Sequence, residues 1–260
     1  MKKVALITGA TSGLGLEFAK IHASQGGSLV LVARNMSKLE EIKVNLQDLY
    51  NVSVLIISID LSNINSAFEI FAQINKENIQ IDYLINNAGF GDFGMFHETD
   101  LEKECRMINL NIITLTILTK LFLSNILRRD ASGKILNIAS TASFQPAPTM
   151  AVYGATKAYV LSFSEAISNE LLNKNISVTT LCPGPTETGF QVASALEGSK
   201  LFSNKKLPTA NEVATFGYNA MVNGKSVVIH GWLNYIMSNS IRFATRSSVL
   251  KISRRILGKV

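Results

Sequence analysis

The chain has 260 residues, 47% hydrophobic and 17% charged, which is the balance of an ordinary globular protein and excludes a disordered or fibrous one. Its formal net charge of +6 comes from residues 231–260, which carry six basic and no acidic side chains. Residues 1–230 have nineteen of each sign, so we expect no nucleic-acid partner. The two cysteines, Cys105 and Cys182, form no CxxC pair, which argues against a disulfide framework and a zinc site and favours a cytoplasmic location.

Short β-branched runs alternate along the chain with longer segments of helical period. The predicted strands are 3–8, 28–33, 52–59, 82–86, 133–139, 176–182 and 226–230. The predicted helices are 14–25, 36–49, 66–77, 101–129, 152–173 and 210–222. This alternation is typical of a single doubly wound α/β domain of Rossmann type, with a parallel sheet of about seven strands and helices on both faces.

The apolar runs of the sequence predict neither a secretory signal nor a membrane span. The apolar run after Lys3 stops after about five residues, whereas a secretory core needs roughly 7 to 15. The longest apolar region is interrupted by Asn111, Lys120 and Asn125, so it predicts no membrane span. The stretch from Pro183 to Pro208 has no clear period and is interpreted as an active-site lid.

A glycine-rich turn, TGATSGLG, follows the first predicted strand and opens the first helix. Such glycines let the backbone turn tightly and let a pyrophosphate approach the first amides of the helix. The candidate cofactor contacts are Gly9, Thr11, Ser12, Gly13, Leu14 and Gly15. A tight turn without a ligand is the alternative, which the strand and helix context makes less favoured.

Cofactor choice is predicted from the end of the second strand. A dinucleotide fold that uses NAD places an acidic residue there, which would repel a 2′-phosphate. Here Ala33 occupies that position and Arg34 follows it. Because a guanidinium pairs with phosphate, the sequence favours NADP over NAD; a solvated arginine is the alternative.

Three polar side chains form a candidate catalytic set. Tyr153 and Lys157 are four residues apart and share one helix face, and Ser140 ends the fifth strand at the sheet edge where α/β folds bind ligands. Proton transfer to a carbonyl oxygen that receives a hydride needs such a set. We expect Lys157, together with the positive nicotinamide of the oxidised cofactor, to lower the phenol pKa from about 10 toward 7, which requires roughly 4 kcal/mol. A core tyrosine beside a surface lysine is the alternative for this pair taken alone.

Taken together, these motifs resemble the short-chain dehydrogenase/reductase family over residues 3 to about 230. The resemblance implies that Asp60 and Leu61 contact the adenine, and that Asn87, Ala88 and Gly89 form the fourth-strand motif. It assigns Pro183, Gly184 and Thr188 to the segment over the nicotinamide. Asn109 is carried over as the residue that holds a water linked to Lys157, beside catalytic Ser140, Tyr153 and Lys157. Ala139 departs from the second serine that the family often has.

The family resemblance also implies a homodimer or homotetramer, in which helices 101–129 and 152–173 pair across an interface. Apolar residues in loops near the expected pocket favour an apolar carbonyl or alcohol substrate; they are Phe90, Phe93, Met95, Phe144, Met150 and Phe190. Each of them is equally well explained as a packing residue.

The segment 231–260 is predicted to be a basic C-terminal helical extension of a catalytic domain at 1–230. On a helical wheel, Val249, Ile252, Ile256 and Val260 share one side. That face either packs on its own domain, covers a partner subunit or makes a weak membrane-surface contact through 249–260. Three functions therefore stay open: an NADP(H)-dependent carbonyl reductase or alcohol dehydrogenase, a ketoacyl or lipid-type reductase at a membrane surface, and an NADP-binding sensor or scaffold without turnover.

Overall fold

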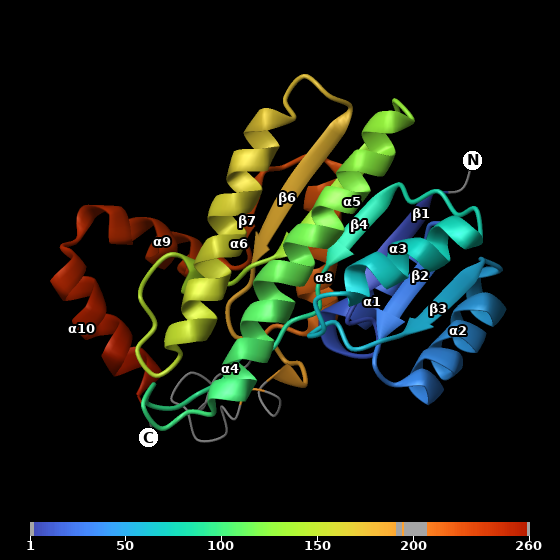
Figure 1. Cartoon of the computed structure of the whole chain (residues 1–260). Helices are drawn as coiled ribbons and strands as arrows, with labels where there is room; N and C mark the ends of the chain where they lie inside the picture. The colour runs from blue at the N-terminus through green and yellow to red at the C-terminus, as the bar shows by residue number, and fades with distance from the viewer. Residues whose placement is uncertain (1–2, 191–193, 195–206, 259–260) are drawn as a thin grey trace.

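A single parallel sheet forms the centre of the protein in the computed structural model, which describes residues 3–190, 194 and 207–258. The strand order is β3-β2-β1-β4-β5-β6-β7 (Figure 1). Strands β2 and β3 extend the sheet to one side of β1, and the remaining four extend it to the other side. The seven strands are β1 (Val4–Thr8), β2 (Ser28–Ala33), β3 (Val54–Ser58), β4 (Tyr83–Asn86), β5 (Gly133–Ile138), β6 (Ile176–Cys182) and β7 (Val227–Ile229). The predicted Rossmann-type sheet is therefore confirmed.

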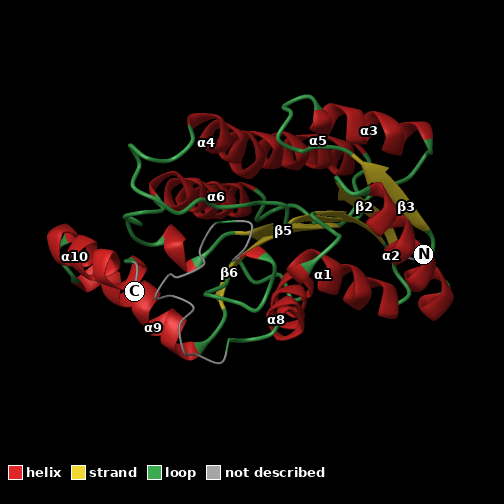
Figure 2. Ribbon diagram, turned by 90° about the horizontal axis from the view of Figure 1, so that it is seen from below, coloured by secondary structure: helices red, strands yellow, loops and turns green. Residues whose placement is uncertain are grey.

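Helices cover both faces of the sheet (Figure 2). In the body of the molecule they are α1 (Gly13–Ser24), α2 (Met36–Tyr50), α3 (Ser66–Lys76), α4 (Leu101–Ile108), α5 (Leu115–Arg128), α6 (Ala151–Glu170) and α8 (Ala210–Val222). One core cluster joins the sheet to α1, α2 and α8, and a second joins it to α3 and α5 on the opposite face. Strands buried from both sides explain the continuous apolar runs of the sequence.

The polar residues at strand and helix ends stabilise this arrangement locally. The Asn35 side chain accepts a hydrogen bond from the Lys38 amide at the start of α2. Thr209 and Glu212 form a reciprocal capping box at the start of α8. Each cap satisfies amides that a helix leaves unpaired at its first turn, so these residues set where the two helices begin.

The longest helical stretch, Leu101–Arg128, combines α4, a π-helical segment η1 (Asn109–Thr114) and α5. By length and composition alone it could cross a membrane, which differs from the prediction made from its three polar residues. In the structure it runs along the sheet, and Leu118, Phe122 and Ile126 are buried in the second core cluster. The stretch is therefore a core helix of this domain.

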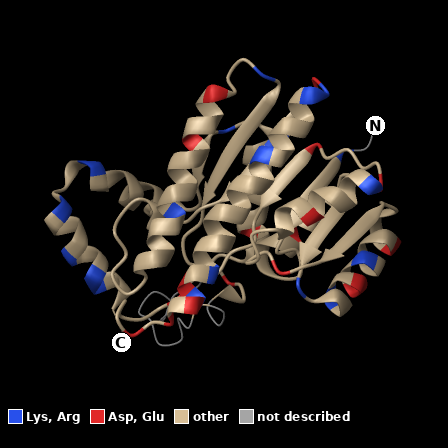
Figure 3. Ribbon diagram, viewed as in Figure 1, with Lys and Arg blue, Asp and Glu red and all other residues tan. Residues whose placement is uncertain are grey.

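The C-terminal extension forms two helices, α9 (Trp232–Ser240) and α10 (Arg246–Leu257), joined through the short helix η3 (Ile241–Phe243). They project from the side of the domain next to α6, and Figure 3 colours basic positions on α10 and on its connection to α9 but no acidic position on either helix. Thr245 caps α10, so the helix begins three residues earlier than the predicted 249. Val260, assigned to the predicted apolar face, lies outside the described residues, as does most of the predicted lid. The boundary at residue 230 stays a prediction.

Candidate active site

The glycine turn between β1 and α1 depends on close backbone contacts. Gly9 has a φ of +67°, a conformation that favours glycine, and its amide donates to the Val32 carbonyl at 2.8 Å. A Cβ on Gly15 would lie 2.1 Å from the Gly9 carbonyl oxygen. The Asn87 side chain donates to the Thr8 and Gly9 carbonyls at 2.9 and 3.2 Å. The turn is thus held by backbone contacts that leave no room for a larger residue.

A cleft of about 1300 Å³ lies at the carboxyl ends of the strands, and most of the predicted site residues line it. They are Gly9, Thr11, Ser12, Gly13, Leu14, Arg34, Asp60, Leu61, Asn87, Ala88, Gly89, Ser140, Tyr153, Lys157, Pro183, Gly184 and Thr188. Gly15 and Asn109 do not line the cleft. Gly15 is buried under the turn, where its missing side chain permits close packing of α1 against β1.

The end of the cleft near β1, β2 and β3 fits a dinucleotide. Ser12 precedes α1 without a side-chain cap in the described structure, so the first amides of the helix face the cleft as an anion site. Arg34 is exposed at the cleft wall. Burial raises the pKa of the Asp60 carboxyl, but hydrogen bonds from Ser62 and the charges of Arg106 and Arg34 outweigh it, so the net shift is downward. This end therefore offers donors for phosphates and an ionised carboxylate for hydroxyl groups.

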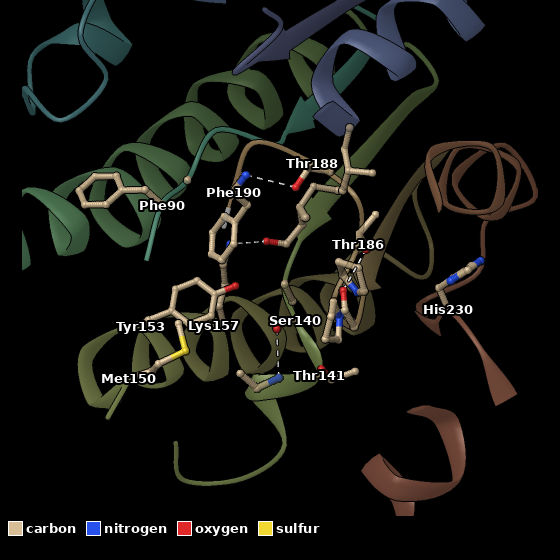
Figure 4. Close-up of a pocket in the computed structure, with 18 of the residues that line it drawn as sticks. Phe90, Ser140, Thr141, Met150, Tyr153, Lys157, Thr186, Thr188, Phe190 and His230 are labelled. Carbon is tan, nitrogen blue, oxygen red and sulfur yellow. Dashed lines mark hydrogen bonds between the residues drawn. The ribbon is translucent and has the colours of Figure 1, made fainter. Parts of the chain in front are cut away.

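Ser140, Tyr153 and Lys157 come together at the other end of the cleft. Ser140 follows β5, and its hydroxyl oxygen accepts a hydrogen bond from the Ala142 amide at 3.1 Å. Tyr153 and Lys157 extend from α6, and the Tyr153 hydroxyl points toward Ser140 (Figure 4). The Lys157 ammonium donates to the Ile138 carbonyl at 2.8 Å and lies 5.8 Å from the centre of the Tyr153 ring. The predicted catalytic trio is thus assembled from one strand end and one helix.

Burial shifts the pKa values of Tyr153 and Lys157. Burial raises the pKa of the Tyr153 phenol to about 12, although its hydrogen bond with Ser140 acts in the opposite direction. Burial also lowers the pKa of Lys157 to about 8, because a low-polarity environment disfavours the ammonium. Among the groups of the chain itself, burial therefore dominates the phenol pKa. The lowering toward 7 that we expect also depends on the positive nicotinamide of the oxidised cofactor, and it stays a prediction. The phenol holds its proton at neutral pH, as a proton donor requires.

The structure brings Asn111, rather than the predicted Asn109, close to Lys157. Asn111 is buried, and its side-chain amide donates to the Phe90 carbonyl and to the Thr156 hydroxyl, both at 3.0 Å. Its Oδ1 and the Lys157 ammonium both lie against Gly89. Asn109 is partly exposed and outside the cleft lining.

Helix geometry separates the two asparagines. The buried side of the long helix includes Met107, Asn111, Thr114 and Leu118, which follow the helical repeat. Asn109 is two positions from Asn111 and so points to a different side. The spacing of the buried residues was the signal in the sequence that would have separated the two asparagines.

The apolar walls near Tyr153 include only part of the predicted set. Phe90, Met150 and Phe190 line the cleft, and the Phe190 ring centre is 5.4 Å from that of Tyr153. The other three predicted residues do not line it. Phe144 packs against a separate core cluster, and Met95 is exposed.

The C-terminal extension supplies a wall of the cleft that sequence reasoning missed. The residues from this segment include Trp232, Leu233, Met237, Ile252, Ile256 and Leu257. Leu257 is buried in the same cluster as Met150 and Tyr153. Asn234 lies so close to Gly184 that a Cβ there would approach its amide nitrogen to 2.5 Å. The helical repeat predicts α10 but carries no information about what it packs on.

Comparison with known proteins places this geometry in a family. Residues 3–197 match the family model of short chain dehydrogenases. A very-long-chain 3-oxoacyl-CoA reductase of Danio rerio is 32% identical over 248 residues, covering 91% of this chain and 74% of that protein. An NADP-dependent 3-hydroxy acid dehydrogenase of Schizosaccharomyces pombe is 31% identical, covering 87% of this chain and 90% of that protein.

A solved structure extends the similarity to the whole fold. It is a short-chain dehydrogenase from Sphingobium yanoikuyae in complex with NADPH, 28% identical to this chain. The TM-score is 0.84, and the match covers 96% of this chain and 95% of that one. The match thus extends well beyond the 3–197 region of the family model.

Proposed function

Because the chain belongs to the short-chain dehydrogenase/reductase family, an oxidoreductase family that acts on carbonyl and alcohol groups, we propose that it is an NADP(H)-dependent reductase of a bulky apolar carbonyl compound. The observation that carries the proposal is the assembly of Ser140, Tyr153 and Lys157 in one cleft with the glycine turn. The reaction adds a hydride and a proton to a C=O bond to give an alcohol, and the reverse reaction removes both.

Each residue of the trio has a defined task in this proposal. NADPH, held by the glycine turn at the other end of the cleft, would supply the hydride. The Ser140 hydroxyl donates a hydrogen bond to the substrate oxygen and so orients it beside the phenol. Tyr153 transfers its proton to that oxygen, and the Lys157 ammonium, 5.8 Å from the ring centre, stabilises the phenolate that remains. The low polarity around both groups strengthens this attraction.

Three features support NADP over NAD. Ala33 stands where an acidic residue would repel a 2′-phosphate, and the exposed Arg34 follows it at the cleft wall. Arg106 also lines this end of the cleft, 3.4 Å from the Asp60 carboxylate. The similar solved structure binds NADPH. Two guanidinium groups at one end suit a phosphate that only NADP carries there.

The walls near Tyr153 support an apolar substrate. Phe90, Met150 and Phe190 approach from the domain, and Ile252 and Ile256 approach from α10. Such a lining favours a bulky hydrocarbon around the carbonyl group over a sugar phosphate. The relative from Danio rerio, which by its name acts on very-long-chain 3-oxoacyl groups, is consistent with this class.

Location and assembly complete the proposal. We expect a cytoplasmic enzyme, since its cysteines Cys105 and Cys182 are both unpaired. We also expect a homodimer or homotetramer that buries the outer sides of α5 and α6, where Leu127 and Tyr159 are exposed. The outer surface of α6 stays partly apolar, with Tyr159 stacked on Phe163 at 5.7 Å.

The substitution Tyr153→Phe tests the proposal against a cofactor sensor without turnover. It removes the proton donor and leaves the ring, so turnover should fall by at least about 100-fold while NADPH binding persists. NADPH absorbance with a panel of aliphatic, aromatic and acyl carbonyl compounds measures turnover, and fluorescence titration measures binding. Tyr159→Phe, on the same helix but outside the cleft, is the matched control. Unchanged turnover in Tyr153→Phe would overturn the mechanism.

A further inference from the structure

We propose that the outer surface of α9 and η3 binds an anionic lipid bilayer and brings the mouth of the substrate cleft to the membrane. The binding residues, called the outer tail face below, are Trp232, Tyr235, Ile236 and Phe243. The membrane contact implies that substrate enters the cleft from the bilayer, and this implication rests on the proposed function.

The outer tail face is apolar and exposed. Trp232, Tyr235 and Ile236 are 71%, 58% and 54% exposed, and Phe243 is 93% exposed. The first three lie on one side of α9 by helical spacing, while the buried Ser238 lies on another side. Large exposed apolar patches mark interaction sites, and tryptophan and tyrosine favour the boundary between lipid and water.

The basic residues around the outer tail face favour a negatively charged partner. The described part of the extension carries Arg242, Arg246, Lys251, Arg254 and Arg255, all exposed, and the segment 231–260 has no acidic residue. Figure 3 shows these basic positions on α10 and on the segment that joins it to α9, whereas α9 itself carries no charged residue. Apolar aromatic residues flanked by arginine and lysine match the composition of helices that lie on anionic membranes.

The same charges argue against a second copy of the chain as the partner. A two-fold contact through α9 would place the outer tail face against itself. It would bring two sets of basic residues together with no acidic residue of this segment to neutralise them. A phosphate-bearing lipid surface supplies the missing negative charge.

This surface differs from the one that the sequence predicted. The apolar side of α10 faces the cleft: Val249 and Leu257 are buried, and Ile252 and Ile256 line the cleft while staying 55% and 38% exposed. The helix α10 therefore serves as a support, and α9 provides the membrane contact. Trp232, Leu233 and Met237 both line the cleft and are more than half exposed, so the mouth of the cleft adjoins the outer tail face.

The single tryptophan of the chain, Trp232, gives a direct test with the unmodified protein. Vesicles of phosphatidylcholine with and without phosphatidylglycerol are mixed with the full chain, and tryptophan emission and vesicle flotation are recorded. We expect a blue shift and flotation with the anionic vesicles, and a loss of both in high salt. Absence of both signals with anionic vesicles would overturn the proposal.

A pair of double variants separates binding through this surface from non-specific binding of vesicles by exposed apolar residues. Ile236→Glu with Phe243→Glu changes two residues outside the cleft, and Val44→Glu with Leu49→Glu on α2 is the control, with 54% and 72% exposure. We expect the first to reduce the vesicle-bound fraction at least about tenfold and the control to leave it unchanged. Equal vesicle binding by both variants would overturn the proposal. An oligomer that the first variant dissociates, without vesicle binding by the original chain, would show that a second copy covers this surface.

Turnover separates this inference from the proposed function. With a water-soluble ketone, the variant Ile236→Glu with Phe243→Glu should keep the rate of the original chain. With a long-chain ketone dissolved in the vesicles, its kcat/KM should fall at least about fivefold. Vesicle binding without any turnover would overturn the enzyme and not the membrane contact; turnover without vesicle binding would do the reverse.

Discussion

The two ends of the cleft are built in different ways. At the cofactor end, backbone groups and short side chains set the shape: Gly9, Gly15 and Asn87 are in contact with no space for an added carbon. At the substrate end, apolar side chains from α6, the loop after β6 and the C-terminal extension form the walls. A surface made by backbone contacts tolerates almost no substitution, whereas one made by side chains can be altered gradually. We expect mutations at the two ends to differ in size accordingly.

Gly15→Ala is the most severe test of the cofactor end. The added Cβ would lie 2.1 Å from the Gly9 carbonyl oxygen, so the glycine turn must shift. We expect NADPH affinity to fall at least about 100-fold, or ~2.7 kcal/mol. Fluorescence titration measures the affinity, and the thermal unfolding midpoint shows whether the fold persists. Normal affinity would mean that this end is more adaptable than its backbone contacts indicate.

Arg34→Asp tests the choice of cofactor at the same end. The change removes a cation and adds a carboxylate near the expected 2′-phosphate, so NADPH should lose about 30-fold relative to NADH. The ratio of kcat/KM for the two cofactors measures the shift. Lys38→Asp makes the same change of charge four residues further along the chain, in the first turn of α2 and outside the cleft. It should leave the ratio unchanged. An equal shift in both variants would indicate a general field effect.

The pair Asn111→Ala and Asn109→Ala tests the junction between the two ends. Asn111 donates to the Phe90 carbonyl and to Thr156, and its Oδ1 lies against Gly89, as the Lys157 ammonium does. Its loss should lower kcat about tenfold and the free energy of unfolding by about 1–3 kcal/mol. Asn109→Ala should change neither by more than about twofold or ~0.5 kcal/mol. A larger effect at Asn109 would restore the assignment made from the sequence.

Ile256→Ala should give the smallest effect, at the substrate end. Ile256 lines the cleft but is 38% exposed, so removing its outer carbons costs little buried surface. We expect kcat/KM for a bulky apolar ketone to fall about three- to fivefold, with little change for a small ketone. Leu250→Ala, also on α10 but outside the cleft, is the control. Equal losses for both ketones would mean that α10 stabilises the domain without contacting the substrate.

The local patterns of the sequence determined the fold and most of the site. Strand and helix periods, the glycine turn and the positions of Arg34, Ser140, Tyr153 and Lys157 are properties of short segments. The carboxyl ends of parallel strands meet at one edge, so residues at those ends could be placed together without coordinates. The choice between Asn109 and Asn111 needed only the buried repeat of one helix.

Only the tertiary structure decided the properties that depend on burial and on packing between segments far apart in the chain. The phenol pKa rises to about 12 because Tyr153 is buried in a cluster with Met107, Met150 and Leu257, residues that lie far apart in the chain. The apolar side of α10 lines the cleft, and Tyr235 and Ile236 of α9 are exposed. A helical repeat states that a face is apolar, but only contacts between segments far apart in the chain decide what covers that face.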